Sequence, residues 1–244
     1  MRVLVFSDVH GNLTALEAVL QAAGPVEAFW FLGDLVGYGP DPEACVQRVR
    51  GLHPLVCLQG NHDAAVVGQL DLSFFNAEAR RSVEWARTQL SPAALAFLQT
   101  RPPLVVLEEW GVTLAHGSPQ RPLEEYLLSE PAVRRAFHAL ETPLAFVGHT
   151  HLPVAFVEGR EGFQIVPGHP GETFTLPPGA RAILNPGSVG QPRDGNPQAA
   201  FALWDTQTGV WSWHRVPYDV RAVQQRMLAL GLPTFHAHRL RRGR

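Results

Sequence analysis

The chain has 244 residues, of which 45% are hydrophobic and 17% charged, and its formal net charge at pH 7 is -2. These values favour a folded globular enzyme over a disordered or coiled-coil protein. They also give no overall attraction to nucleic acid or to an anionic membrane. The two cysteines, Cys45 and Cys57, are too few for a disulfide framework, and we expect both to be buried free thiols.

No apolar run of the sequence approaches the roughly 18 residues that a membrane-spanning helix needs. The first residues lead directly into a strand-like run, and they do not have the pattern of a signal peptide. We therefore expect a soluble, cytoplasmic protein.

The first part of the chain alternates between apolar strands and amphipathic helices. The sequence predicts strands over 2–7, 29–32 and 55–58. Asn12 and Asp41, the latter followed by Pro, are expected to begin the intervening helices. A β-α-β-α-β order favours a sheet of parallel strands joined by right-handed crossovers.

The second part of the chain begins with two predicted helices, over 76–90 and after Ser91–Pro92. Short strands with Gly and Pro turns then prevail, interrupted by a helical insertion at about 119–140. Later strand candidates lie at 163–166, 181–184, 199–204 and 210–216, and a last helix is expected at about 218–230. The basic tail, 236–244, is expected to be solvated and frayed.

No internal repeat, low-complexity tract or linker divides the sequence. We therefore expect a single domain, 1–244, of the α/β class, with two stacked mixed β-sheets forming a sandwich flanked by helices. The insertion at 119–140 is expected either to border the active site or to serve as a helical pad on a sheet.

Five strand-like runs are each followed by side chains that can bind a metal ion. Considered singly, each of these groups is more often a turn residue, a helix cap or a hydrogen-bonded histidine. Together they lie where an α/β sheet presents its binding site, just past the carboxyl ends of strands. The residues are Asp8, His10, Asp34, Asn61, His116, His149 and His151.

The order of these motifs resembles that of the calcineurin-like metallophosphoesterase superfamily, whose fold is a double β-sheet sandwich flanked by helices. The motifs are Asp-x-His at 8–10, Gly-Asp at 33–34, Gly-Asn-His-Asp at 60–63, His116 and Gly-His-x-His at 148–151. The loop Asn-Pro-Gly-Ser-Val-Gly-Gln-Pro-Arg at 185–193 also resembles a loop of small bacterial and archaeal phosphodiesterase-like members, so the resemblance spans most of the chain.

Two departures separate the chain from the eukaryotic protein phosphatases of this superfamily. Those enzymes carry Asp-Arg-Gly soon after their Gly-Asp motif, whereas this chain has Val36-Gly37-Tyr38. They also have Glu in place of Asp63. Both differences argue against protein phosphatase activity.

The resemblance implies a centre of two divalent metal ions that share Asp34. It assigns one ion to Asp8, His10, Asp34 and His151, and the other to Asp34, Asn61, His116 and His149. Nitrogen and oxygen ligands without thiolate suit Mn, Fe, Zn, Ni or Co, and Mn is our expectation.

The resemblance also places His62 beside the leaving oxygen, where it would donate a proton. Asp63 is expected either to orient the His62 ring or to cap a helix. Arg193 is a candidate for binding substrate phosphate, because Arg binds phosphate bidentately.

These observations predict a dinuclear metal-dependent phosphoesterase that hydrolyses small phosphodiesters or nucleotides. Diesters are expected to be preferred, because few arginines lie near the motif loops. A phosphomonoesterase or protein phosphatase-like enzyme is one alternative, and a metal-stabilised scaffold that lacks catalysis is another. A nuclease is disfavoured by the net charge and the lack of an added nucleic-acid-facing domain. Association into a homo-oligomer is left open.

Overall fold

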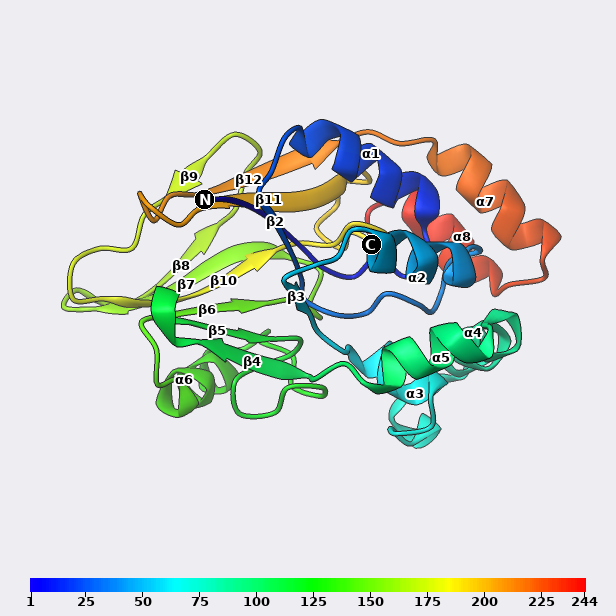
Figure 1. The fold of residues 1–244 in the computed structure, drawn as a ribbon, viewed down its shortest axis with the longest axis horizontal. Helices are drawn as coiled ribbons and strands as arrows, with labels where there is room; N and C mark the ends of the chain where they lie inside the picture. The colour runs from blue at the N-terminus through cyan, green and yellow to red at the C-terminus, as the bar shows by residue number, and fades with distance from the viewer.

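Two six-stranded mixed sheets pack face to face in the computed structural model, which describes residues 1–244 (Figure 1). In the first sheet the order is β3 (Val56–Cys57), β2 (Ala28–Phe31), β1 (Arg2–Phe6), β11 (Ala199–Asp205), β12 (Trp211–Val216) and β9 (Thr173–Phe174). In the second it is β4 (Leu104–Leu107), β5 (Val112–Ala115), β6 (Leu144–Val147), β10 (Arg181–Pro186), β7 (Pro153–Gly159) and β8 (Gly162–Pro167). The predicted fold class is confirmed.

In each sheet, the candidate ligands follow strands that pair in parallel. β1 pairs in parallel with β2, which pairs in parallel with β3. In the second sheet β6 is parallel to both β5 and β10. The residues at the carboxyl ends of these parallel strands therefore leave each sheet at one edge, as the alternation of strands and helices predicts.

Alternate residues of β1 face two different cores. Val3 and Val5 belong to the core between the sheets, together with Trp30. Leu4 and Phe6 belong to a second core beneath the helices. Since both faces of β1 are covered, the strand is apolar throughout, as is typical of parallel strands in α/β proteins.

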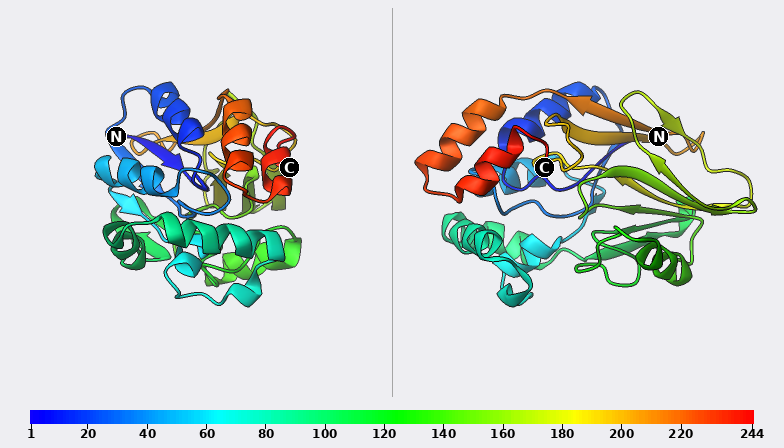
Figure 2. Two further views of the ribbon diagram at one scale, coloured as in Figure 1. Left: turned by 90° about the vertical axis from the view of Figure 1, so that its right-hand side faces the viewer. Right: turned by 180° about the vertical axis from the view of Figure 1, so that it is seen from behind.

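The helices cover the outer faces of the sheets and the end of the molecule (Figures 1 and 2). The side chains of Asn12, Asn76 and Ser91 cap α1 (Leu13–Ala23), α4 (Ala77–Gln89) and α5 (Pro92–Gln99). Asp41 makes no such bond and pairs instead with Arg226. No helix combines the length and the apolar character needed to cross a membrane. The helices are α1 (Leu13–Ala23), α2 (Pro42–Gly51), α3 (Asn61–Val66), α4 (Ala77–Gln89), α5 (Pro92–Gln99), α6 (Glu130–Ala139), α7 (Val220–Ala229) and α8 (Thr234–Leu240).

The insertion at 119–140 is helical over a shorter range than predicted. Only α6 is a helix, and it packs Val133 and Phe137 on the outer face of the second sheet. The preceding residues, 119–129, form turns in which Gly117 N–H donates to the Pro122 carbonyl. Prolines at 119 and 122 remove the N–H groups that a continuous helix would need, so the helix begins only after them.

The expectation of a frayed tail is wrong for most of 236–244. Residues 234–240 form α8, which buries Ala237 and Leu240 against Val223 and Met227 of α7. Figure 2 shows the two helices together at the end of the molecule away from β8 and β9. The apolar positions recur at a spacing of three, which puts them on one helical face.

Truncating the Leu240 side chain should undock α8 without unfolding the sheets. Leu→Ala changes in packed sites cost about 2–5 kcal/mol, and Leu240 is only 3% exposed. In Leu240→Ala we expect faster hydrogen exchange at the amides of α8, with unchanged exchange in β1 and β6. His238→Ala, at an exposed position of the same helix, is the matched control. Exchange that stays the same in Leu240→Ala would contradict the docking.

Candidate metal centre

The loops that carry the candidate ligands turn sharply at the ligands themselves. Asp8, His10, Asp34, His149 and His151 all have positive φ, at 56°, 49°, 60°, 64° and 61°. Non-glycine residues rarely adopt this left-handed conformation, and each instance costs on the order of 1–3 kcal/mol. Backbone strain concentrated at these five residues is typical of a functional site.

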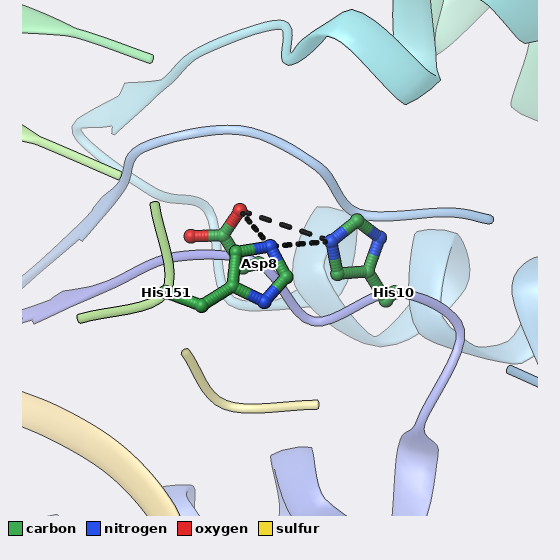
Figure 3. Close-up of side chains that lie close together, drawn as sticks. All are labelled: Asp8, His10 and His151. Atoms are coloured by element: carbon green, nitrogen blue, oxygen red, sulfur yellow. Dashed lines mark hydrogen bonds and ion pairs between the residues drawn. The ribbon is translucent and has the colours of Figure 1, made fainter. Parts of the chain in front are cut away.

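Three overlapping groups of side chains could each hold a metal ion, and one of them joins His10, Asp34 and His62. Asp8, His10 and His151 form the first group, although Asp8 and His151 lie far apart in the sequence (Figure 3). Asp8 Oδ1 lies 3.2 Å from His151 Nε2 and 3.8 Å from His10 Nε2. The two Nε2 atoms are 3.1 Å apart. All three side chains are almost completely buried.

Asp34, His116 and His149 form the second group. His116 Nε2 lies 3.4 Å from Asp34 Oδ2, 3.1 Å from His149 Nδ1 and 3.2 Å from Asn61 Oδ1. Asp34 Oδ2 also lies 3.5 Å from His10 Nε2 of the first group. The structure therefore brings all seven sequence-predicted ligands together, with Asp34 between the two groups.

Hydrogen bonds to main-chain carbonyls fix the orientation of three rings. Because a carbonyl can only accept, these contacts place a proton on Nδ1 and leave a lone pair on Nε2 of the neutral ring. The Nδ1–H groups of His10, His116 and His151 donate to the carbonyls of Val36, Leu32 and Gln191 at 3.1, 2.9 and 2.5 Å. Histidines that bind metal ions usually make this kind of bond with the second nitrogen.

The resulting arrangement fits a cation. In their neutral forms His10 and His151 direct two Nε2 lone pairs at each other with no proton between them. Asp8 Oδ1, which lies beside both rings, is buried and has no hydrogen-bond partner. Buried polar atoms without partners are rare, and an ion at this position would satisfy the lone pairs.

The two carboxylates stay charged despite their burial. Burial by itself raises the pKa values of Asp8 and Asp34, but the neighbouring histidines outweigh burial and lower both below the usual range. The opposite holds for His116, where burial lowers the pKa but Asp34 and Asp8 together raise it to about 9. A proton on His116 therefore compensates the carboxylates in the metal-free protein.

The remaining histidines of the centre are neutral near pH 7. Burial lowers the pKa values of His10, His149 and His151, even though Asp34 or Asp8 opposes the shift. A neutral imidazole can bind a metal ion without first losing a proton.

His62 is held by aromatic contacts and not by Asp63. Its ring lies against Tyr38 at 4.4 Å and Phe75 at 4.9 Å between centroids, and its Nδ1 is buried without a partner. Burial lowers its pKa to about 4, although Asp34 opposes the shift. Of the two roles expected for Asp63, orienting the His62 ring is not the one seen, because its carboxylate accepts from main-chain N–H groups instead.

Asp63 instead organises the main chain around the site. As the third residue of α3 it accepts from the N–H of Gly60, the N-cap residue, at 3.0 Å. Its carboxylate also accepts from Leu35 and Val36 N–H, which follow Asp34. Burial and the charge of Asp34 raise its pKa to about 7 despite these three donors. Asp63 therefore ties the loop after β2 to the loop after β3.

Arg193 lies at the edge of the two groups. Its Nη2 donates to Gln191 Oε1 at 3.0 Å, and its guanidinium carbon is 6.0 Å from the centre of the Tyr38 ring. The charge of Arg193 contributes to the lowered pKa values of His10, His62 and His151, which places this predicted residue beside the centre.

A cavity of about 160 Å³ opens beside the centre. Asn61, His62 and His149 line one part of it, and Phe74 and Tyr126 line another. Tyr126 stacks on His149 with ring centroids 3.7 Å apart. The two alternative roles of the insertion therefore fall to different parts of it: its first turns line the cavity, whereas α6 packs on the sheet.

Sequence reasoning missed several aromatic side chains of this region, including Phe74 and Phe75, which line the cavity, as well as Tyr38 and His236. Tyr38 lies in a Gly-rich stretch after Asp34, and its flanking glycines were the only signal of a tight loop. His236 stacks on Tyr38 at 4.4 Å between centroids, and the sequence contained no signal of this contact.

Comparison with known proteins agrees with this geometry. A model of the calcineurin-like phosphoesterase superfamily domain matches residues 1–209. The chain is 34% identical over 247 residues to uncharacterized protein MJ0912 of Methanocaldococcus jannaschii, covering 99% of this chain and 98% of that protein. It is 30% identical over 216 residues to phosphodiesterase YfcE of Escherichia coli K12, covering 84% of this chain and 88% of YfcE.

Solved structures give the same result. A metallophosphoesterase from Sphaerobacter thermophilus superposes with a TM-score of 0.90 at 41% identity, covering 100% of this chain and 99% of that one. A protein from Pyrococcus horikoshii OT3, at 20% identity, shares the fold with a TM-score of 0.80 over 100% of this chain and 98% of its own. The ligand motifs, the paired sheets and these matches lead to one conclusion: the chain belongs to the calcineurin-like phosphoesterase superfamily.

Proposed function

We propose that residues 1–244 act as one domain, a phosphoesterase that depends on two divalent metal ions and hydrolyses small phosphodiesters or nucleotides. The observation that carries the proposal is the position of Asp34, whose Oδ2 lies 3.5 Å from His10 Nε2 and 3.4 Å from His116 Nε2. One carboxylate shared by two sets of nitrogen and oxygen donors is the arrangement that a pair of ions requires. The similarity to phosphodiesterase YfcE supports the same reaction class.

The ligands divide between the ions according to the two groups. Asp8, His10, Asp34 and His151 would hold one ion, and Asp34, Asn61, His116 and His149 would hold the other. The donor set contains no thiolate, and we propose Mn²⁺, with Fe, Zn, Ni and Co as chemically compatible ions. When bound, such a pair supplies Lewis-acid polarisation of the phosphoryl group and lowers the pKa of water.

We assign His62 the role of proton donor to the leaving oxygen. Its neutral state in the free protein follows from burial, which lowers its pKa to about 4. A phosphate anion bound beside the ring favours the protonated form, because an opposite charge nearby raises the pKa of an imidazole. Tyr38 and Phe75 hold the ring in place and shield it from water.

The cavity favours substrates that carry an aromatic group. Phe74 is 65% exposed and Tyr126 44% exposed, and both line the cavity that holds His62. Stacking of a base on an aromatic side chain contributes about 1–3 kcal/mol. An exposed aromatic wall next to the ligands supports nucleotide-like esters over small alkyl esters, and a complete ligand set argues against a scaffold without catalysis.

Removing the bridging carboxylate tests the proposal directly. Asp34→Ala should lose both ions and reduce phosphodiester hydrolysis by more than about 100-fold, since even changes to the outer partners of metal ligands cost 10–100-fold. Asp34→Asn keeps the shape without the charge and should retain weaker metal binding. Metal content is measured by elemental analysis, with Asp219→Asn, an exposed helix cap, as the control. Two bound ions in Asp34→Ala would contradict the assignment.

Metal binding should release a proton from His116. Its pKa of about 9 means that Nε2 is protonated at neutral pH and must lose that proton to bind an ion. At pH 7 we expect Mn²⁺ binding to release about one proton per chain. The release should vanish, and the affinity should stop rising, once the pH exceeds about 9.

Calorimetric titration in buffers of different ionisation enthalpy measures this release. His116→Asn, which keeps a neutral donor near Asp34, should bind metal more weakly and release no proton. Proton release of equal size in the variant would assign the proton to another group.

The aromatic wall should select for a base. Phe74→Ala removes the exposed ring of the cavity and should raise the KM for 3′,5′-cyclic AMP about tenfold, within the range that stacking provides. The KM for glycerophosphoethanolamine, which has no ring, should change little. Leu128→Ala is the matched control, because Leu128 is 63% exposed but does not line this cavity. Equal changes in KM for both esters would contradict a stacking role for Phe74.

A further inference from the structure

A histidine near the end of the chain packs against the ring that holds His62. His236 of α8 is 1% exposed and stacks on Tyr38, with ring centroids 4.4 Å apart. Tyr38 contacts His62 at the same centroid distance. Tyr38 is therefore the ring that the two histidines have in common.

The loop that carries Tyr38 depends on its surroundings for its shape. Tyr38 has a φ of 60°, in the left-handed region that residues other than glycine rarely adopt. Such a conformation costs on the order of 1–3 kcal/mol and persists only where neighbouring residues hold it. Three rings contact Tyr38, those of His10, His62 and His236, and only His236 lies outside the candidate metal centre.

The contact depends on the ring of His236 and not on its nitrogen atoms. Both nitrogens are buried without a hydrogen-bond partner. Burial lowers the pKa of His236 to about 3, so the ring is neutral near pH 7. A neutral ring packs as another aromatic side chain would, and such pairs contribute about 0.5–1.5 kcal/mol beyond the area they bury.

The two C-terminal helices are fixed to the same loop. Arg226 of α7 pairs at 2.9 Å with Asp41, which follows Tyr38 closely in the chain. Gln224 of α7 donates to a main-chain carbonyl of α8 at 2.7 Å. Side chains of both helices, together with His10 and Tyr38, line a cavity of only about 10 Å³, which has room for one water molecule at most. Packing this close transmits a displacement of α8 to Tyr38.

The His62 ring is held by contacts and not by a hydrogen bond. Its Nδ1 is buried without a partner, and a Cβ added at Gly37 would lie 2.4 Å from that atom. The orientation of the ring therefore depends on Tyr38, on Phe75 and on the main chain of the Tyr38 loop. Accurate placement matters in a proton donor, because a misplacement of about 1 Å can cost about 100-fold in rate.

We propose that His236 is a positioning residue for the proton donor His62, that it acts through Tyr38, and that α7 and α8 hold the loop after β2 in place for this purpose. Both helices lie beyond residue 209, where the match to the superfamily domain ends, so this support comes from outside the matched region. His236 does not line the cavity and touches no substrate there. The inference rests on the proposed role of His62.

Two esters that differ only in their leaving group test this role. In metal-loaded His236→Ala we expect kcat for phenyl methyl phosphate to fall at least about tenfold, because the basic phenolate needs a proton from His62. The kcat for p-nitrophenyl methyl phosphate, whose leaving group needs no proton, should change less than about twofold. Metal content and KM should stay the same. His236→Phe keeps an aromatic ring and should restore the rate, and His238→Ala, at an exposed position of α8, is the matched control.

A double-mutant cycle assigns the effect to His62. His62→Gln alone should show the same dependence on the leaving group, and adding His236→Ala to it should cause no further loss. Losses that multiply in the double variant, an equal loss for both esters, or equal behaviour of His236→Ala and His236→Phe would overturn the inference.

Chemical labelling of the metal-free protein separates this inference from the proposed function. His62 is 3% exposed, so its acylation by diethyl pyrocarbonate should be slow in the unmodified chain. Peptide mass spectrometry should show labelling of His62 that rises several-fold in His236→Ala but not in His236→Phe. Unchanged labelling would overturn the inference. If instead the proposed function fails, the loaded unmodified chain hydrolyses neither ester, whereas the labelling of His62 still responds to His236→Ala.

Discussion

The arrangement of the loops in this molecule depends on pairs of imidazole nitrogens that face one another in its buried interior. His10 and His151 approach to 3.1 Å, and so do His116 and His149. Such pairs are unfavourable unless a proton or a cation lies between them, and burial removes the water that could otherwise intervene. The fold must therefore hold these rings by other means, and it does so with main-chain carbonyls of the segments after β2 and β10 and with carboxylates that stay charged.

The same constraint explains how closely the loops approach one another. A Cβ added at Gly60 would lie 2.1 Å from Asp34 Oδ1, one at Gly148 would lie 2.0 Å from Ser7 Oγ, and one at Gly190 would lie 1.8 Å from the Val9 carbonyl oxygen. No side chain fits at such distances. These glycines are required by contacts between loops, and the ligands meet because the backbones that carry them touch.

Residues that follow strands directly could be placed from the sequence, whereas residues brought in by packing could not. Asp8, Asp34 and His149 could be assigned because a parallel strand fixes where its next residue emerges. His236 belongs to a helix more than 70 residues beyond His149 in the chain, and only the packing of α8 on α7 places it against Tyr38. Asp63 has the second of its two expected roles, at the start of α3. Its bonds to Leu35 and Val36 could not be predicted, because they join two loops whose contact is tertiary.

The centre takes its ligands from both sheets. Asp8, Asp34 and Asn61 follow strands of one sheet, whereas His116 and His149 follow strands of the other. Ions held by the proposed centre would cross-link two layers that are otherwise joined by the apolar core around Trp30. The angle and the distance between the sheets would then set the spacing of the metal ligands. A substitution deep in that core, far from any ligand, would change the affinity and selectivity for metal before it unfolds the chain.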